Sequence, residues 1–77
     1  MTEFLNPVRR AWAEGRVAVN GWIASSAVIT AEAMAAARWD SLTIDMQHGT
    51  ADYAALLSLF PAIEKAGTAP FVRVPWL

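Results

Sequence analysis

Apolar and polar residues alternate with two different periods along this chain, and the changes of period predict helices and strands in turn. Near the amino end, three apolar residues recur at helical spacing, namely Val8, Ala11 and Trp12. Asn6 can cap free backbone N–H groups, Pro7 suits the first helical position, and Gly15 supplies a stop. We therefore expect a short amphipathic leading helix within residues 1–16.

The next two segments predict a strand and then a helix. Residues 17–24 are rich in β-branched and aromatic side chains, a composition typical of strands. Residues 31–38 are dominated by alanine, which favours a helix and allows it to approach a sheet closely. Thr30 can cap this helix, and Ile29 can pack on Met34 as a hydrophobic staple.

A two-residue period returns in residues 41–45 and predicts the second strand. Leu42 and Ile44 fall on one face of this strand, while Thr43 and Asp45 fall on the other. If Asp45 faces the inside of a barrel, the apolar pair faces outward against helices.

A long amphipathic helix and a third strand complete the pattern. The helix should begin near Asp52 and end at Gly67, with an apolar stripe made of Tyr53, Leu56, Leu57, Phe60 and Ile63. Pro61 removes a backbone hydrogen bond inside it, so we expect a kink or a break there. Residues 71–74 should form the third strand, which Pro75 limits.

This order of elements predicts an α/β fold with a parallel sheet, because helices that alternate with strands connect parallel neighbours. An eight-stranded barrel would need five more strands. We interpret residues 1–77 as the amino-terminal part of a single (β/α)8 TIM barrel domain that is incomplete in this chain. Residues 1–16 would hold the leading helix, and residues 17–77 three β strands with two intervening helices.

The composition points to a missing partner. The chain has 77 residues, of which 56% are hydrophobic, and four of them are tryptophan. Soluble domains are typically about 45 to 50% apolar, and so short a chain buries only about 60 to 65% of its unfolded surface. We therefore expect a second subunit or a longer polypeptide to cover the excess apolar surface.

Several classes of protein are excluded by the same composition. No apolar run approaches the ~20 residues of a membrane-spanning helix, and the amino end lacks the layout of a signal peptide. Cysteine is absent, and the formal net charge is -1 with scattered basic residues. We expect a soluble, cytoplasmic protein with no membrane or nucleic-acid partner.

Charged residues stand at the ends of two predicted strands. Asp45 closes the second strand, His48 follows three residues later, and Arg73 lies near the end of the third. Reactive groups in parallel α/β folds gather at the carboxyl ends of strands, and a guanidinium in an apolar strand is costly unless it meets an anion. With Trp22 as an aromatic wall, these residues form a candidate site for proton transfer on an anionic organic substrate.

The residues around this site resemble a known family. Residues 39–49 read WDSLTIDMQHG and residues 71–76 read FVRVPW. Together these runs are similar to the HpcH/HpaI aldolase family, the class II pyruvate aldolases typified by 4-hydroxy-2-oxoheptanedioate aldolase and 2-dehydro-3-deoxyglucarate aldolase. The likeness runs from about Val17 to the end of the chain. It implies a (β/α)8 barrel with a divalent metal, Mg²⁺, Mn²⁺ or Co²⁺, that cleaves a 4-hydroxy-2-oxo acid to pyruvate and an aldehyde, or joins them.

The resemblance also implies roles for particular residues. His48, supported by Asp45, would take part in acid/base proton transfer, and Arg73 would contact the keto oxygen and stabilise the enolate. Trp22 and Gln47 would line the substrate site, although many family members have Glu at the latter position. The family's metal ligands, a Glu and an Asp, come from later strands, so we expect no metal ligand in these 77 residues. Family members assemble into hexamers, which implies a homo-oligomer.

Other interpretations stay open at this point. Arg73 and Asp45 could form a structural ion pair instead of a ligand site. The 77-residue chain could be a truncated, non-catalytic product that needs a partner, and we expect it to be inactive by itself. The same barrel could also belong to a citrate lyase β-like enzyme that acts on an acyl thioester.

Overall fold

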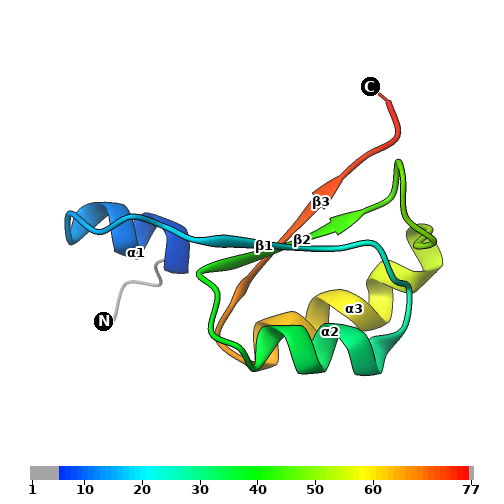
Figure 1. Ribbon diagram of the computed structural model, residues 1–77, viewed down its shortest axis with the longest axis horizontal. Helices are drawn as coiled ribbons and strands as arrows, with labels where there is room; N and C mark the ends of the chain where they lie inside the picture. Colours follow the sequence, from blue (N-terminus) through cyan, green and yellow to red (C-terminus); the bar gives the residue numbers. More distant parts are fainter. Residues whose placement is uncertain (1–5, 77) are drawn as a thin grey trace.

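Three parallel strands with two helices packed on one face make up the centre of the molecule (Figure 1). The computed structural model describes residues 6–76. In chain order the elements are α1 (Pro7–Ala13), β1 (Asn20–Ile23), α2 (Val28–Ala35), β2 (Ser41–Asp45), α3 (Tyr53–Lys65) and β3 (Ala69–Arg73). The α/β class and the alternation of elements are therefore confirmed, and the sheet is consistent with the start of a barrel.

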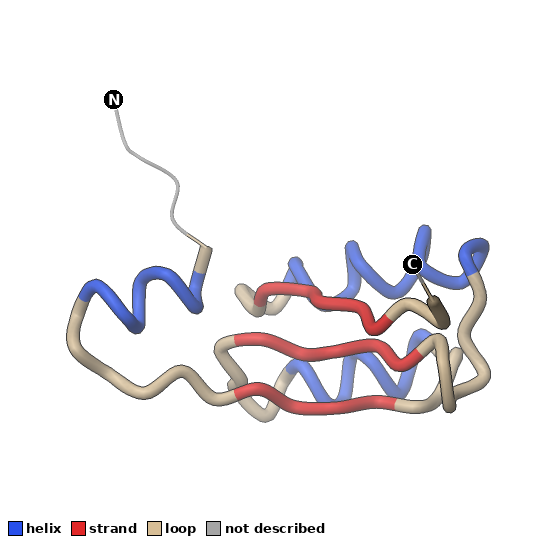
Figure 2. Tube along the Cα trace, turned by 90° about the horizontal axis from the view of Figure 1, so that it is seen from above, coloured by secondary structure: helices blue, strands red, loops and turns tan. Residues whose placement is uncertain are grey.

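The strands lie in the order β1, β2, β3, and each neighbouring pair is parallel. Trp22 pairs with Thr43, and Asp45 pairs with Arg73. Figure 2 shows α2 and α3 on the same side of the sheet and α1 apart from them, beyond the ends where the strands begin. The carboxyl ends of all three strands point away from α1.

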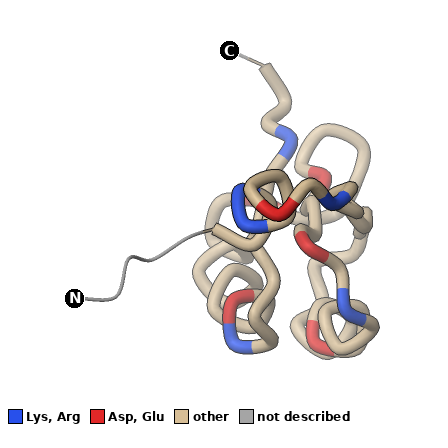
Figure 3. Tube along the Cα trace, turned by 90° about the vertical axis from the view of Figure 1, so that its left-hand side faces the viewer, with Lys and Arg blue, Asp and Glu red and all other residues tan. Residues whose placement is uncertain are grey.

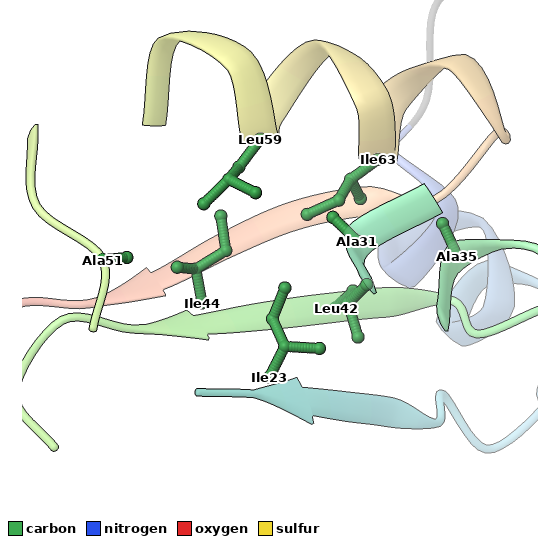
Figure 4. Close-up of a cluster of buried hydrophobic side chains, with 8 residues drawn as sticks. All are labelled: Ile23, Ala31, Ala35, Leu42, Ile44, Ala51, Leu59 and Ile63. Atoms are coloured by element: carbon green, nitrogen blue, oxygen red, sulfur yellow. The ribbon is translucent and has the colours of Figure 1, made fainter. Parts of the chain in front are cut away.

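The core lies between the sheet and its two covering helices (Figure 4). Leu42 and Ile44 of β2 are fully buried, and they meet Leu59 and Ile63 of α3. The other members of this cluster are Ile23, Ala31, Ala35 and Ala51. The expected alternation along the second strand is confirmed, since its apolar side chains face the helices. The alanines of α2 allow that helix to lie close to the strands.

The opposite face of the sheet is polar and aromatic, and no helix within residues 6–76 covers it. It carries the residues that alternate with the core positions, namely Asn20, Trp22, Ser41, Thr43, Asp45, Ala69, Phe71 and Arg73. Trp22 is 47% exposed and Phe71 is 44% exposed. We refer to this surface as the open face.

Two helix starts follow the sequence prediction, and one does not. The side chain of Asn6 accepts a hydrogen bond at the start of α1, and that of Asp52 does so at the start of α3. By contrast, α2 begins after Ala27, so Thr30 lies inside the helix and the predicted Thr30 cap is wrong. The Ser25 hydroxyl accepts from the Ala27 N–H and starts the turn earlier than expected.

The predicted staple from Ile29 to Met34 is also wrong, because Ile29 is 75% exposed. The exposure of Ile29 follows from the earlier start of α2, which turns this side chain to solvent. Trp12 is likewise exposed, although its spacing placed it on the apolar side of the leading helix. The buried residues of α1 are Val8 and Ala11.

The strand boundaries and the proline prediction need correction as well. Strand β1 begins at Asn20, three residues later than expected, because the Val19 N–H donates to the Asp40 carboxylate. Strand β3 begins two residues early, at Ala69, and ends before Val74. Helix α3 continues through Pro61 without the break that was considered. Pro61 is exposed, so water can satisfy the carbonyl that loses its partner.

Positions of Lys or Arg and of Asp or Glu are interspersed along the described part of the chain (Figure 3). None of the helices within residues 6–76 has the length and apolar character needed to cross a membrane.

Candidate active site

The Asp45 carboxylate is the centre of a cluster at the carboxyl end of β2. Arg73, its register partner on β3, donates from Nε to Oδ1 at 3.1 Å and from Nη2 to Oδ2 at 2.6 Å. Trp22 of β1 donates from its indole Nε1 to Oδ2 at 3.2 Å. Side chains from three adjacent strands therefore meet at one carboxylate.

The chain after β2 turns back onto the same carboxylate. The backbone N–H groups of Gln47 and His48 donate to Asp45 Oδ1 at 2.9 and 3.0 Å. Asp45 thus accepts five hydrogen bonds, and the residue is only 3% exposed. A buried carboxylate is stable when its oxygens are satisfied in this way.

These donors keep Asp45 ionised. The Arg73 guanidinium is the largest cause that holds the pKa of Asp45 well below its usual range, and the His48, Trp22 and Gln47 N–H groups lower it further. Burial acts in the opposite direction, because it disfavours the charged form, but it is outweighed. Asp45 is therefore a fixed negative charge near neutral pH and not a group that exchanges protons.

The Arg73 guanidinium is held on two sides. Its Cζ lies 5.0 Å from the centre of the Trp22 ring, a cation–π arrangement, while the carboxylate binds Nε and Nη2. Among residues 6–76 these contacts leave Nη1 for a ligand, and the side chain stays 40% exposed. A fixed, partly exposed guanidinium can bind a carboxylate or a developing enolate oxygen.

A glycine allows the loop to close over the end of β2. A Cβ at Gly49 would lie 2.6 Å from the carbonyl oxygen of Ala24 and closer still to that of Asp45. No side chain fits in that space. Gly49 therefore lets residues 46–48 approach the carboxylate closely enough for their N–H groups to bind it.

The predicted site residues come together in two different ways. Asp45, Arg73 and Trp22 meet through their side chains, whereas Gln47 and His48 reach the cluster through backbone N–H groups. The His48 side chain is exposed, and within residues 6–76 no hydrogen bond joins its imidazole to Asp45. The Gln47 amide donates to the Pro75 carbonyl oxygen at 3.5 Å, a long contact between the two loops.

Sequence reasoning missed two groups of residues around the site. One is Gly49, whose need for close approach is visible only in three dimensions. The other comprises Asn20, Ser41 and Thr43, which are joined by hydrogen bonds on the open face. The sequence did contain a signal for this second group, because its residues alternate with the core positions as Trp22 and Asp45 do and so fall on the same face of the sheet.

The described residues do not fit a divalent metal. Within residues 6–76 no group of three or more His, Cys, Asp or Glu side chains comes together. Both oxygens of Asp45 are committed to N–H donors, so this carboxylate has little capacity left for a cation. No chemical step through a metal follows from these residues.

Comparison with known proteins gives relatives over nearly the whole chain. It is 42% identical over 69 residues to a hydroxypyruvate/pyruvate aldolase of Rhizorhabdus wittichii, which covers 90% of this chain and 28% of that relative. It is 33% identical over 72 residues to a 5-keto-4-deoxy-D-glucarate aldolase of Salmonella paratyphi A, with 94% of this chain and 28% of that relative covered. The chain thus spans little more than a quarter of the length of these relatives.

No family model matches the chain. The two aldolases nevertheless align over 90% and 94% of the chain, at 42% and 33% identity. They are members of the family that the paired motifs at residues 39–49 and 71–76 resemble. Over at least 90% of its length, the chain is therefore homologous to members of the HpcH/HpaI aldolase family.

Proposed function

We propose that the protein containing these residues is a carbon–carbon lyase that cleaves a 4-hydroxy-2-oxo acid to pyruvate and an aldehyde, and catalyses the reverse addition. The main support is the Arg73 guanidinium, which Asp45 and Trp22 fix at the carboxyl ends of the strands with one nitrogen left for a ligand. The aldolase names of the relatives point to the same class of reaction.

The proposed reaction is a retro-aldol cleavage. A base removes the proton of the substrate's 4-hydroxyl, the bond between C3 and C4 breaks, and the aldehyde leaves. The electron pair passes to C3 and the C2 oxygen as an enolate, whose negative charge Arg73 stabilises. Protonation at C3 then gives pyruvate.

His48 is the proposed residue for these proton transfers. It follows the strand end by three residues, its backbone is anchored to Asp45, and its side chain is exposed toward solvent. An imidazole can accept and return a proton near neutral pH. Asp45 supports this role indirectly, because its carboxylate holds the loop and the guanidinium while staying ionised.

The barrel, the metal and the substrate-lining residues that the family resemblance implies are also proposals for the whole protein. We propose a (β/α)8 barrel in which the open face of the sheet faces the interior. We propose that the divalent metal is bound by residues outside 6–76, and that Gln47 and Trp22 line the substrate site. Residues 1–77 by themselves are expected to be inactive, because the open face lacks neighbouring elements and the described residues offer no metal site.

The test is an assay of pyruvate release by the protein expressed from its complete coding region. A set of 4-hydroxy-2-oxo acids is supplied, and pyruvate is measured by coupled reduction to lactate. Arg73→Ala should abolish most of the release, whereas Arg9→Ala, which changes an exposed arginine of α1, should not. Removal of divalent metal with a chelator should stop the reaction, and Mg²⁺, Mn²⁺ or Co²⁺ should restore it. Absence of pyruvate release from every acid would overturn the proposal.

A further inference from the structure

A second polar cluster lies on the open face, one step toward the amino ends of the strands from the Asp45 cluster. The side-chain oxygen of Asn20 accepts a hydrogen bond from Ser41 Oγ at 2.7 Å and another from Thr43 Oγ1 at 2.8 Å. We call these three residues the hydroxyl cluster. One oxygen on β1 is thereby tied to two points of β2.

The geometry of this cluster is specific to the observed register of the strands. Ser41 is the register partner of Asn20, and Thr43 is the next residue of β2 on the same face. Ser41 is 2% exposed and Thr43 is 6% exposed, so both hydroxyls are shielded from water. A buried hydroxyl that lacks a partner is costly, and therefore the two donors favour the position of Asn20 that satisfies both.

The hydroxyl cluster adjoins the residue that links β1 to the candidate site. Trp22 is the register partner of Thr43 and lies two residues after Asn20 on the same face. Its indole donates to Asp45, and Arg73 lies over its ring. Because no described helix covers this side of Trp22, packing alone does not hold the indole in place.

We propose that Asn20 is a positioning residue for the candidate active site. Its side-chain oxygen holds β1 to Ser41 and Thr43 of β2, which keeps the Trp22 indole at Asp45 and, through both, keeps the Arg73 guanidinium oriented. Neither the relatives' names nor the residues implied by the family resemblance include this role. Asn20 does not touch the reacting atoms and acts only through Trp22.

The first experiment reads the position of Trp22 directly and does not depend on the proposed activity. The protein from the complete coding region is labelled with ¹⁵N, and the indole N–H resonance of Trp22 is assigned by its loss in Trp22→Phe. In Asn20→Ala, this N–H should exchange with solvent roughly three- to tenfold faster, as expected for the weakening of one to two hydrogen bonds. Asn20→Asp retains the accepting oxygen and should keep the slower exchange.

Two further variants separate positioning from general destabilisation. Thr68→Val removes another buried hydroxyl, which donates to the Trp39 carbonyl oxygen away from Trp22, and should leave the Trp22 exchange rate unchanged. Ser41→Ala combined with Thr43→Val removes both hydroxyl donors while keeping side chains of similar size. This double variant should reproduce the effect of Asn20→Ala. This double variant decides the question if Asn20→Ala does not fold. Unchanged Trp22 exchange in the double variant would overturn the proposal.

A second experiment rests on the proposed function. If Asn20 positions Arg73 through Trp22, Asn20→Ala should lower kcat roughly three- to tenfold, with a smaller effect on the KM for the 4-hydroxy-2-oxo acid, because Arg73 acts on the enolate, and Asn20→Asp should recover most of the loss. A protein without aldolase activity would fail this assay while the indole measurement still tests Asn20. An Asn20→Ala variant with altered indole exchange but unchanged kcat would show that Asn20 does not serve the site.

Discussion

Asp45 and Arg73 are register partners on adjacent parallel strands, and their side chains meet in a two-point ion pair at the strand ends. This pair uses the Nε and Nη2 atoms of the guanidinium and leaves Nη1 directed away from the carboxylate. A structural ion pair and a ligand site, considered as alternatives from the sequence, are therefore compatible in one arrangement. The carboxylate fixes the arginine, and the arginine keeps a donor for an anion.

Replacement of Arg73 by lysine tests whether the shape of the cation matters. An ammonium keeps the positive charge but cannot bind Asp45 at two points and a ligand with a third planar N–H group. We expect Arg73→Lys to lower kcat/KM roughly 10²- to 10³-fold, the range for removal of one preorganised donor. The measurement is steady-state pyruvate release, with Arg9→Lys as the matched control. Wild-type kinetics in Arg73→Lys would contradict the assigned role.

Replacement of His48 tests the proposed proton transfer. The side chain is exposed, so His48→Gln should leave the folded structure and its melting temperature nearly unchanged. We expect kcat to fall roughly 10²- to 10⁴-fold, the usual contribution of a positioned acid or base. If turnover persists at the wild-type level, another group carries the proton.

Acid should destabilise the fold through Asp45. The folded-state pKa of this carboxyl is lowered, chiefly by Arg73, so its contribution to stability is complete above the ordinary unfolded value of about 3.9 and is lost as the pH falls below it. Asp45→Asn should be less stable than the wild type near neutral pH, and the difference should narrow in acid. Urea unfolding from pH 7 to pH 2 measures this. If the free energy of unfolding changed with pH in the same way in both proteins, Asp45 would be excluded as the source of the acid destabilisation.

A methyl group at Gly49 should disrupt the loop. The added carbon would collide with the carbonyl oxygens of Ala24 and Asp45, and backbone atoms cannot move aside as a flexible side chain can. We expect Gly49→Ala to lower the free energy of unfolding by about 1 to 3 kcal/mol, the usual cost of overpacking. Ser58→Ala, at an exposed position of α3, should change it little. A wild-type melting temperature in Gly49→Ala would show that residues 46–48 do not need this close approach.

The sequence was sufficient for the order and type of the elements because strong periodic signals governed them. The alternation in residues 41–45 predicted which side chains face the helices, and Leu42 and Ile44 are indeed fully buried. Boundaries failed where a side chain outside the predicted element accepted a hydrogen bond from a backbone N–H group. Asp40 takes the N–H of Val19 and delays β1, and Ser25 starts α2 before the predicted cap.

The site was only partly predictable for a similar reason. Register brings Asp45 beside Arg73, and the position of these residues at strand ends was enough to suggest that they meet. The five donors on Asp45 depend on a loop that returns over the strand end, which no periodic pattern encodes. The roles of His48, Gln47 and the metal stay predictions.

The sheet described here ends in two outer strands, β1 and β3, each paired on one side within residues 6–76. The backbone donors and acceptors on the other side of such strands can recruit strands from other molecules. A polypeptide limited to these residues is therefore expected to self-associate into β-rich aggregates as its concentration rises. Such aggregation, which light scattering measures, would lower the activity of that polypeptide even where its catalytic groups were intact.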